Sequence, residues 1–396
     1  MVIDRQGLDA EVDALRPVLV ELAARLHSHP ELAFEEHRAA GWIAAAIEAE
    51  QVTVERGLGG LPTAFRARIG SGASPKVAIL AEYDALPELG HACGHNLIAA
   101  GALGAFLALA RVVQRSPNGL AGSVELIGTP AEEGGGGKIQ LLRAGVFEQV
   151  DAAMMYHPYD RDLLANPALA TTKLVFTFCG APAHAAIAPW DGRSALTACL
   201  ETFRLIDAQR VHFRDGVRVH GIVTDGGQAV NVIPERAECM FQLRATSVSE
   251  LARLRQIAER CARGAALACG VEVEISERQG YQSMENNLTL ARRFGTALAA
   301  LGRHAAECDP SAGAGSTDMG DVSQAVPSIH PYLAICERGY ALCHQHAFAA
   351  CANSERGHDT ACVAAKALAR TTADLLEDTA LLAAVRAEFE HSRFQR

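Results

Sequence analysis

The sequence predicts an α/β protein: a larger domain with a central, mostly parallel sheet flanked by helices, and a smaller domain inserted into it. Three observations favour this class. The chain has 396 residues, enough for two cores. Continuous apolar runs typical of buried parallel strands alternate with segments of helical periodicity in its first part. From about Thr171 the pattern changes to the alternation typical of half-buried strands, which indicates a second domain.

The first part of the chain begins with apolar residues at helical spacing from Leu8 to Leu26, which predict a helix that ends near His29-Pro30. The elements expected after it are a helix at 34–48, strands at 63–69 and 77–80, a helix at 97–113, and strands at 124–127 and 152–156. The apolar run at 97–110 is shorter than the roughly 20 residues of a membrane span, so we expect a buried helix and no membrane partner.

The middle of the chain predicts the order β-α-β-β-α-β, which is the ferredoxin-like unit and can fold as a compact insertion. Its expected elements are strands at 172–179, 217–224, 237–246 and 271–276, and helices at 192–209 and 247–269. The inserted domain therefore covers residues 171–284, between first-domain segments 1–170 and 285–396. The last segment predicts helices at 287–301 and 359–377 and a glycine-rich loop at 313–321.

The composition is that of an ordinary globular protein, with 49% hydrophobic and 21% charged residues. A formal charge of −10 argues against a nucleic-acid surface. The first residues lack the pattern of a secretory signal, so we expect a cytoplasmic protein. Eleven cysteines without a paired framework predict reduced thiols, most of them small core residues such as Cys179, Cys239 and Cys261.

The stretch from Glu82 to Asn96 carries the densest chemistry in the chain, AEYDALPELGHACGHN with its leading Ala81. His91, Cys93 and His95 alternate with small residues, so an extended backbone would aim their side chains the same way. The stretch follows a predicted buried strand, and open α/β sheets bind ligands beyond the carboxyl ends of their strands. This favours a metal-binding edge, with ordinary buried side chains beside a solvated acidic turn as the alternative.

Two later strand ends also carry polar side chains: Glu132 and Glu133 in GTPAEEGGGGK, and His157 before Pro158. The glycine run is not a phosphate loop, because Ile139 stands where the Walker pattern needs Ser or Thr after the lysine. Its glycines instead let the backbone turn tightly behind the two glutamates.

Several motifs together resemble one family, the two-metal amidohydrolases that contain aminoacylases, carboxypeptidase G, carnosinase-like dipeptidases and indole-acetyl-amino-acid hydrolases. The motifs are LHSHPELAFEE, AEYDALPELGHACGHN, GTPAEEGGGG, His157-Pro158, GAPAHAAIAPWDGRSAL, GGQAVNVIPERAE, GSTDMGDVS and CHQHAF. Asn96 after CGH, together with GSTDMG, most resembles the p-aminobenzoyl-glutamate hydrolase subunits and the aminoacyl-lysine dipeptidases.

This resemblance implies two divalent metal ions, zinc or manganese, since thiolate suits zinc and carboxylate and imidazole accept both. The implied ligands are Cys93, His95, Glu133, His157 and His344. His346 lies close to the last of these, but the family spacing H-x-x-x-F favours His344. The resemblance makes Asp84 the carboxylate that orients a ligand imidazole, with a solvated turn aspartate as the alternative.

The resemblance also implies roles in the inserted domain, which it makes a lid and dimerisation domain. His184 would reach the partner subunit's active site and stabilise the oxyanion, which implies a homodimer. Asn231 and Arg244 would contact the substrate's carbonyl and carboxylate, although alternation alone would make Arg244 a strand-surface charge. Ser194 departs from the family's G-x-N-A motif, so no substrate contact is assigned to it.

The function implied is metal-dependent hydrolysis of the amide bond of an N-acyl or aminoacyl amino acid, a dipeptide or an aryl amide. Glu132 would be the general base for a metal-activated water. Two alternatives stay open. Cys93 could be a nucleophile with a histidine base, which would survive chelation but not alkylation. The chain could also be a catalytically silent binding homologue, which would turn over no amide substrate.

Overall fold

The computed structural model describes residues 3–70, 74–115 and 120–394. It divides into two compact units, one formed by residues 1–167 and 284–396 and the other by residues 168–283. The boundaries expected from the sequence are residues 171 and 284. We refer to these parts as unit 1 and unit 2.

Unit 1 is built on a mixed sheet whose strands, within the described residues, follow the order β1-β2-β4-β3-β5-β11. The pairs β3–β4, β3–β5 and β5–β11 are parallel, and β1–β2 and β2–β4 are antiparallel. The strands are β1 Val54–Arg56, β2 Phe65–Gly70, β3 Lys76–Ala81, β4 Ser123–Gly128, β5 Ala152–Met154 and β11 Ser328–Ile329. This confirms the predicted α/β class with a mostly parallel sheet. A separate parallel pair joins β6 His157–Tyr159 to β12 Tyr332–Ala334.

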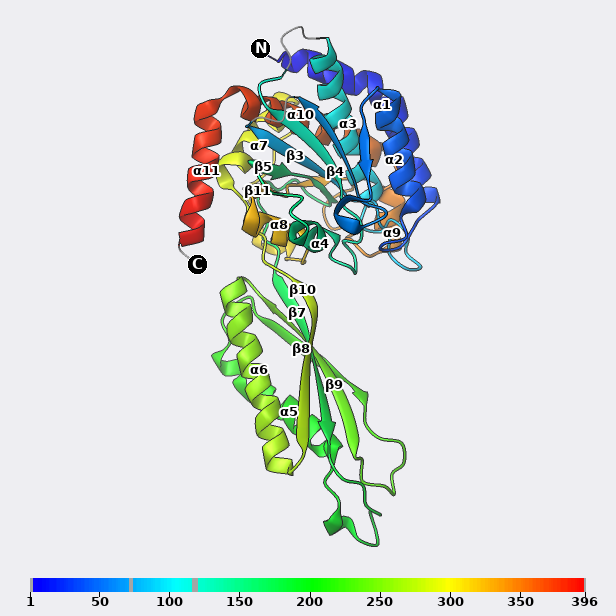
Figure 1. Ribbon diagram of the computed structural model, residues 1–396, viewed down its shortest axis with the longest axis vertical. Helices are drawn as coiled ribbons and strands as arrows, with labels where there is room; N and C mark the ends of the chain where they lie inside the picture. Colours follow the sequence, from blue (N-terminus) through cyan, green and yellow to red (C-terminus); the bar gives the residue numbers. More distant parts are fainter. Residues whose placement is uncertain (1–2, 71–73, 116–119, 395–396) are drawn as a thin grey trace. The chain divides into compact units, whose positions relative to one another are not determined.

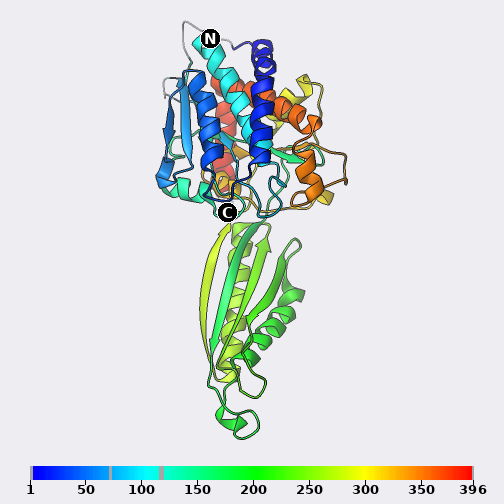
Figure 2. The same ribbon diagram turned by 90° about the vertical axis from the view of Figure 1, so that its right-hand side faces the viewer.

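Helices pack against this sheet and against one another (Figures 1 and 2). They are α1 Arg5–Ser28, α2 His37–Ala49, α3 His95–Gln114, α4 Gly137–Arg143, α7 Leu288–Ala300, α8 Met319–Ala325, α9 His346–Cys351, α10 Glu355–Glu377 and α11 Thr379–Phe394. Asp4 caps α1 by accepting the backbone N–H of Gln6. The predicted apolar stripe from Leu8 to Leu26 is buried except at Val18, which is 44% exposed. Short 3₁₀ turns lie at Leu58–Gly60 and Pro310–Ala312.

The helix α3 is the core helix of unit 1. By length and composition it would be long enough to cross a membrane, but 83% of its apolar window is buried against α1, α10 and the sheet. Glycines permit these close contacts, because a Cβ on Gly101 would lie 2.5 Å from the Tyr156 ring and one on Gly104 would lie 2.6 Å from Leu19. The helix is therefore buried, as its sequence predicts.

Unit 2 has the expected element order β-α-β-β-α-β, and its antiparallel sheet has the strand order β10-β7-β9-β8. Its elements are β7 Ala170–Cys179, α5 Ala195–Gln209, β8 Arg218–Asp225, β9 Arg236–Ala245, α6 Val248–Cys269 and β10 Glu272–Tyr281, with 3₁₀ turns at Pro189–Asp191 and Arg210–His212. Alternate residues of β9, such as Phe241 and Leu243, are buried with α5 and α6 in a core of their own.

The structure corrects some local predictions. Cys239 and Cys261 are buried, but Cys179 is exposed, because it ends β7 at the edge of the core. All eleven cysteines lie in the described residues and are free thiols, as expected. The glycine-rich loop ends sooner than predicted, since α8 begins at Met319. Two further helices, α4 and α11, form in segments where no helix was predicted.

Candidate active site

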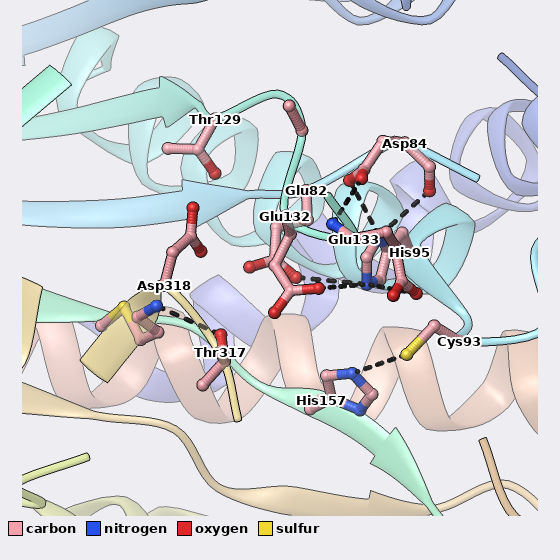
Figure 3. A network of polar contacts seen from close by, with 12 residues as sticks. Glu82, Asp84, Cys93, His95, Thr129, Glu132, Glu133, His157, Thr317 and Asp318 are labelled. Carbon is pink, nitrogen blue, oxygen red and sulfur yellow. Dashed lines mark hydrogen bonds and ion pairs between the residues drawn. The ribbon is translucent and has the colours of Figure 1, made fainter. Parts of the chain in front are cut away.

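The predicted strand-end side chains of unit 1 meet because their strands are neighbours. The strand β3 lies between β4 and β5 and runs parallel to both, so the three carboxyl ends face the same edge of the sheet. Figure 3 shows Cys93 and His95, Glu132 and Glu133, and His157 around one small space.

His95 is the first residue of α3 and is completely buried. Its Nδ1 lies 3.0 Å from both the backbone oxygen and Oδ1 of Asp84. Both neighbours are acceptors, so Nδ1 carries the hydrogen and Nε2 faces the site. The preceding Gly94 has a positive φ of 80°, and a Cβ there would lie 2.9 Å from Pro158. A glycine is therefore needed between the two donors Cys93 and His95.

The remaining donors come from two distant segments. The Nδ1–H of His157 donates to the Pro158 carbonyl at 2.7 Å, which leaves its Nε2 3.5 Å from the Cys93 Sγ. The Nε2 of His344 lies 3.3 Å from Oε2 of Glu133. The backbone N–H of His344 donates to the Ala92 carbonyl at 2.9 Å, so the segment that carries His344 is tied to the one that carries Cys93.

The five sequence-predicted ligands and Glu132 fall into three overlapping groups of three residues. Within each group, the ligand atoms lie within 4.8 Å of one another. The groups are Cys93, His95 and His157; Cys93, Glu133 and His344; and His95, Glu132 and Glu133. In a tetrahedral zinc site, two donors lie about 3.3 to 3.8 Å apart, which matches the Cys93–His157 and His344–Glu133 separations. Among the described residues, His95 Nε2 and Glu133 Oε1 are buried without a hydrogen-bond partner. These donors therefore fit a divalent cation.

The electrostatics also fit a cation. Burial opposes a charged imidazole at His95, yet Asp84 and the surrounding glutamates raise its pKa well above the usual value. Burial and the nearby His95 lower the pKa of His157 to about 4, so this imidazole is neutral, as a ligand must be. Burial would raise the pKa of Glu133, but His344 and His95 lower it. The cluster thus favours positive charge at its centre.

Glu132 is buried, with 7% of its surface exposed, and its Oε2 lies 3.9 Å from His95 Nε2. Burial and the neighbouring Glu133 raise its pKa well above the usual range. A carboxyl group with a raised pKa beside a ligand cluster is suited to accept and return a proton.

Cys93 is not set up as a nucleophile. The adjacent Cys343 thiol and burial raise the pKa of Cys93 well above its usual value, whereas nucleophilic cysteines have a lowered pKa. Its membership of two donor groups instead suits a ligand.

Three charged residues beside the cluster were not assigned from the sequence. Lys138 is completely buried and pairs with Oε1 of Glu82 and, at 2.7 Å, with Oδ1 of Asp318. Burial raises the pKa of Asp318 to about 6. The sequence shows only a lysine after a glycine run, and no spacing rule links it to carboxylates 56 and 180 residues away.

Three further polar residues singled out in the sequence, Asn96, His91 and His346, are not part of the donor groups. Asn96 donates from Nδ2 to the carbonyls of Ala23 and Ala352, and so ties α3 to its neighbours. His91 is buried and stacks on His27. His346 begins α9, is exposed and belongs to none of the three donor groups, which favours His344 as the ligand.

The predicted site residues of unit 2 lie at two ends of its sheet. The segments of His184 and Asn231 pair with each other, since Ala185 N–H donates to the Asn231 carbonyl at 3.0 Å, and both side chains are exposed. Arg244 lies opposite Thr171, near the other end of β9, and burial lowers its pKa. Unit 2 therefore brings His184 and Asn231 together but separates both from Arg244.

The α/β fold, with thiol, imidazole and carboxylate donors at its strand ends and a further buried carboxylate beside them, indicates that the protein is an α/β metallohydrolase. Peptidase family M20/M25/M40 matches residues 78–367. Xaa-Arg dipeptidase of Mus musculus is 40% identical over 395 residues, which cover 96% of this chain and 90% of that protein. A p-aminobenzoyl-glutamate hydrolase subunit from Escherichia coli K12 is 34% identical over 314 residues, 74% of this chain and 65% of that one.

The fold matches that of a dinuclear metal-binding M20 peptidase from Bacillus subtilis, with a TM-score of 0.73 and 24% identity over 92% of this chain and 99% of that one. The chain belongs to peptidase family M20/M25/M40 and is a metal-dependent hydrolase of amide bonds. The family resemblance seen in the sequence motifs is confirmed.

Proposed function

We propose that the protein cleaves the amide bond of a dipeptide or N-acyl amino acid, and that dipeptides ending in a basic residue are the substrates to test first. The observation that carries the proposal is the convergence of five ligand candidates and Glu132 in one cluster, in which only His344 is exposed. The similarity to the mouse Xaa-Arg dipeptidase supports a dipeptide, and that to the E. coli hydrolase supports an aryl amide of glutamate as the second candidate.

Two divalent ions, zinc or manganese, would be held by Cys93, His95, Glu133, His157 and His344. Cys93, His95 and Glu133 each belong to two of the three groups, so the groups overlap through these three donors. Such ions supply Lewis-acid chemistry, since they activate water near neutral pH and polarise a carbonyl. Asp84 holds His95 in the tautomer that turns Nε2 toward the site.

Glu132 would take a proton from the attacking water and return it to the leaving amine, a role worth roughly 10² to 10⁴ in rate. Its position supports this role, because it is buried beside Glu133 and within 3.9 Å of a ligand candidate. Two adjacent carboxylates can then divide the work, with Glu133 as a ligand and Glu132 as the proton carrier.

Unit 2 would be a ferredoxin-like lid and dimerisation domain of a cytoplasmic homodimer, with His184 acting on the oxyanion in the partner subunit. Asn231 and Arg244 would contact the substrate's carbonyl and carboxylate. Two features support an interface: β8 lies at an edge of its sheet with Ile222 60% exposed, and Trp190 is 78% exposed.

The test is a panel of Xaa-Arg and Xaa-Lys dipeptides, N-acyl amino acids and p-aminobenzoyl-glutamate, assayed by amine release. We expect turnover that is lost on treatment with a chelator and restored by Zn²⁺ or Mn²⁺. Turnover that survives chelation but not alkylation would make Cys93 a nucleophile. No turnover of any substrate with either metal would support a silent binding homologue.

A further inference from the structure

Glu36 is a buried carboxylate in unit 1 that the chemistry above does not use. It lies in the connection between α1 and α2, within the motif LHSHPELAFEE, and none of its surface is exposed. The adjacent Glu35 has a side chain that is 75% exposed. Glu36 stands at the N-terminal cap position of α2, but its side chain makes no capping hydrogen bond there. Its burial therefore needs another explanation.

The carboxylate of Glu36 joins three segments that are far apart in the sequence. Its Oε1 accepts the backbone N–H of Phe34 at 3.0 Å and that of Ala131 at 2.9 Å. Its Oε2 accepts the hydroxyl of Thr63 at 2.9 Å. The Thr63 carbonyl in turn accepts the hydroxyl of the buried Tyr83 at 2.7 Å.

Ala131 immediately precedes Glu132 and Glu133, and its backbone is held at both ends. It has a positive φ of 62°, which L-residues other than Asn and Asp rarely adopt. Its N–H donates to Glu36, and its carbonyl accepts the N–H groups of Gly135 and Gly136 at 3.1 and 2.8 Å. The ring of Phe34 covers Gly135, where an added Cβ would lie 2.3 Å from it.

We propose that Glu36 is a positioning residue: it holds the strained Ala131 peptide and thereby aims Glu132 and Glu133 at the metal site. The inference rests on the proposed roles of those two glutamates. Positioning matters here because a displacement of about 1 Å can cost roughly 10²-fold in rate. The Ala131 N–H requires a hydrogen-bond acceptor at Oε1 of residue 36, but it does not require a negative charge there.

The test compares Glu36→Gln with Glu36→Met. Glutamine keeps a carbonyl oxygen for the Phe34 and Ala131 amides, and its NH₂ group can donate to the Thr63 hydroxyl. Methionine has a similar shape and no comparable acceptor. We expect Glu36→Gln to keep kcat within about threefold of wild type, and Glu36→Met to lower it roughly 10- to 100-fold with a smaller change in KM. The affinity for Zn²⁺, titrated against a fluorescent chelator, should follow the same order because Glu133 is a ligand candidate.

Two controls separate positioning from a loss of stability. Thr63→Val removes the contact at Oε2 and leaves the Ala131 bond intact, and Glu35→Gln changes the exposed neighbour; both should keep kcat. If Glu36→Met does not fold, Glu36→Asp carries the test, since its shorter side chain cannot reach all three donors and should also lower kcat and Zn²⁺ affinity.

Wild-type kcat and Zn²⁺ affinity in the folded Glu36→Met or Glu36→Asp variant would overturn the inference. A loss in Thr63→Val equal to that in Glu36→Met would also overturn it, because stability alone would then explain both. A different result tests the proposed function: an active Glu132→Gln variant would contradict it, whatever the activities of the Glu36 variants.

Discussion

The Oδ1 of Asp84 lies 3.0 Å from Nδ1 of His95, with both side chains fully buried, and the other carboxylate oxygen of Asp84 accepts the Glu133 N–H at 2.9 Å. One carboxylate thus orients two ligand candidates from different strand ends. Burial alone would raise the pKa of Asp84, but His95 and the Glu133 N–H lower it, so Asp84 stays ionised.

Replacing Asp84 with asparagine should weaken metal binding roughly 10- to 100-fold. The variant loses the charge that supports His95, and its NH₂ group would face the Glu133 N–H, donor against donor. Competition with a chelator of known affinity measures the effect. Asp13→Asn, a change at an exposed carboxylate, is the control and should bind metal normally. Unchanged affinity in Asp84→Asn would rule out the orienting role.

Replacing Lys138 with methionine should destabilise the protein by about 3 to 5 kcal/mol, because Glu82 and Asp318 would be left as buried carboxylates without a counter-charge. The free energy of unfolding in urea measures this. Lys366→Met breaks a pair with the largely exposed Asp13 and should cost about 0 to 1 kcal/mol. Equal costs in the two variants would contradict a structural role for the Lys138 cluster.

Glu36 should make stability depend on pH. Burial, with a smaller contribution from Asp84, raises its pKa from 4.5 to about 7 in the folded protein. The folded state therefore holds the proton more tightly than the unfolded state. This contribution is fully present below pH 4.5 and is lost as the pH rises through 7. In metal-free protein, the free energy of unfolding of wild type relative to Glu36→Gln should fall by up to about 3 kcal/mol across this range. A constant difference would contradict the raised pKa.

Much of unit 1 follows from local sequence patterns. The helix α1 and the strands β3 and β4 lie close to their predicted positions, because an apolar stripe or a short apolar run between turns allows few other structures. Cys93 and Glu133 were expected at one sheet edge because each follows a predicted buried strand, and open α/β sheets bind ligands beyond the carboxyl ends of such strands. The helix α2 was expected at Phe34 and begins at His37, because residues before it form the loop that buries Glu36.

The supporting residues of the site could not be predicted in the same way. Glu36, Lys138 and Asp318 act through contacts between segments 27 to 180 residues apart, and no periodicity records such pairings. The GGGGK segment predicts a tight turn, which Gly136 makes with a φ of 63°. It does not reveal that α4 then buries a lysine between two carboxylates.

Mixing two inactive variants tests the proposed action of His184 across subunits. His184→Ala retains Glu132, and Glu132→Gln retains His184, so a mixed dimer would contain one complete site. After subunit exchange, activity should return to about a quarter of the wild-type value for a two-fold dimer. Light scattering should give the mass of a dimer. No recovery from an exchanged, dimeric mixture would place His184 outside the partner's reaction.

Glu132→Gln tests the central claim most directly. The variant should bind as much Zn²⁺ or Mn²⁺ as wild type and unfold at the same urea concentration, yet lose roughly 10² to 10⁴ in kcat, because only the proton carrier has been removed. Glu133→Gln is the matched control, since it should lose metal as well as activity. A Glu132→Gln enzyme that keeps both its metal and its wild-type turnover would contradict the account.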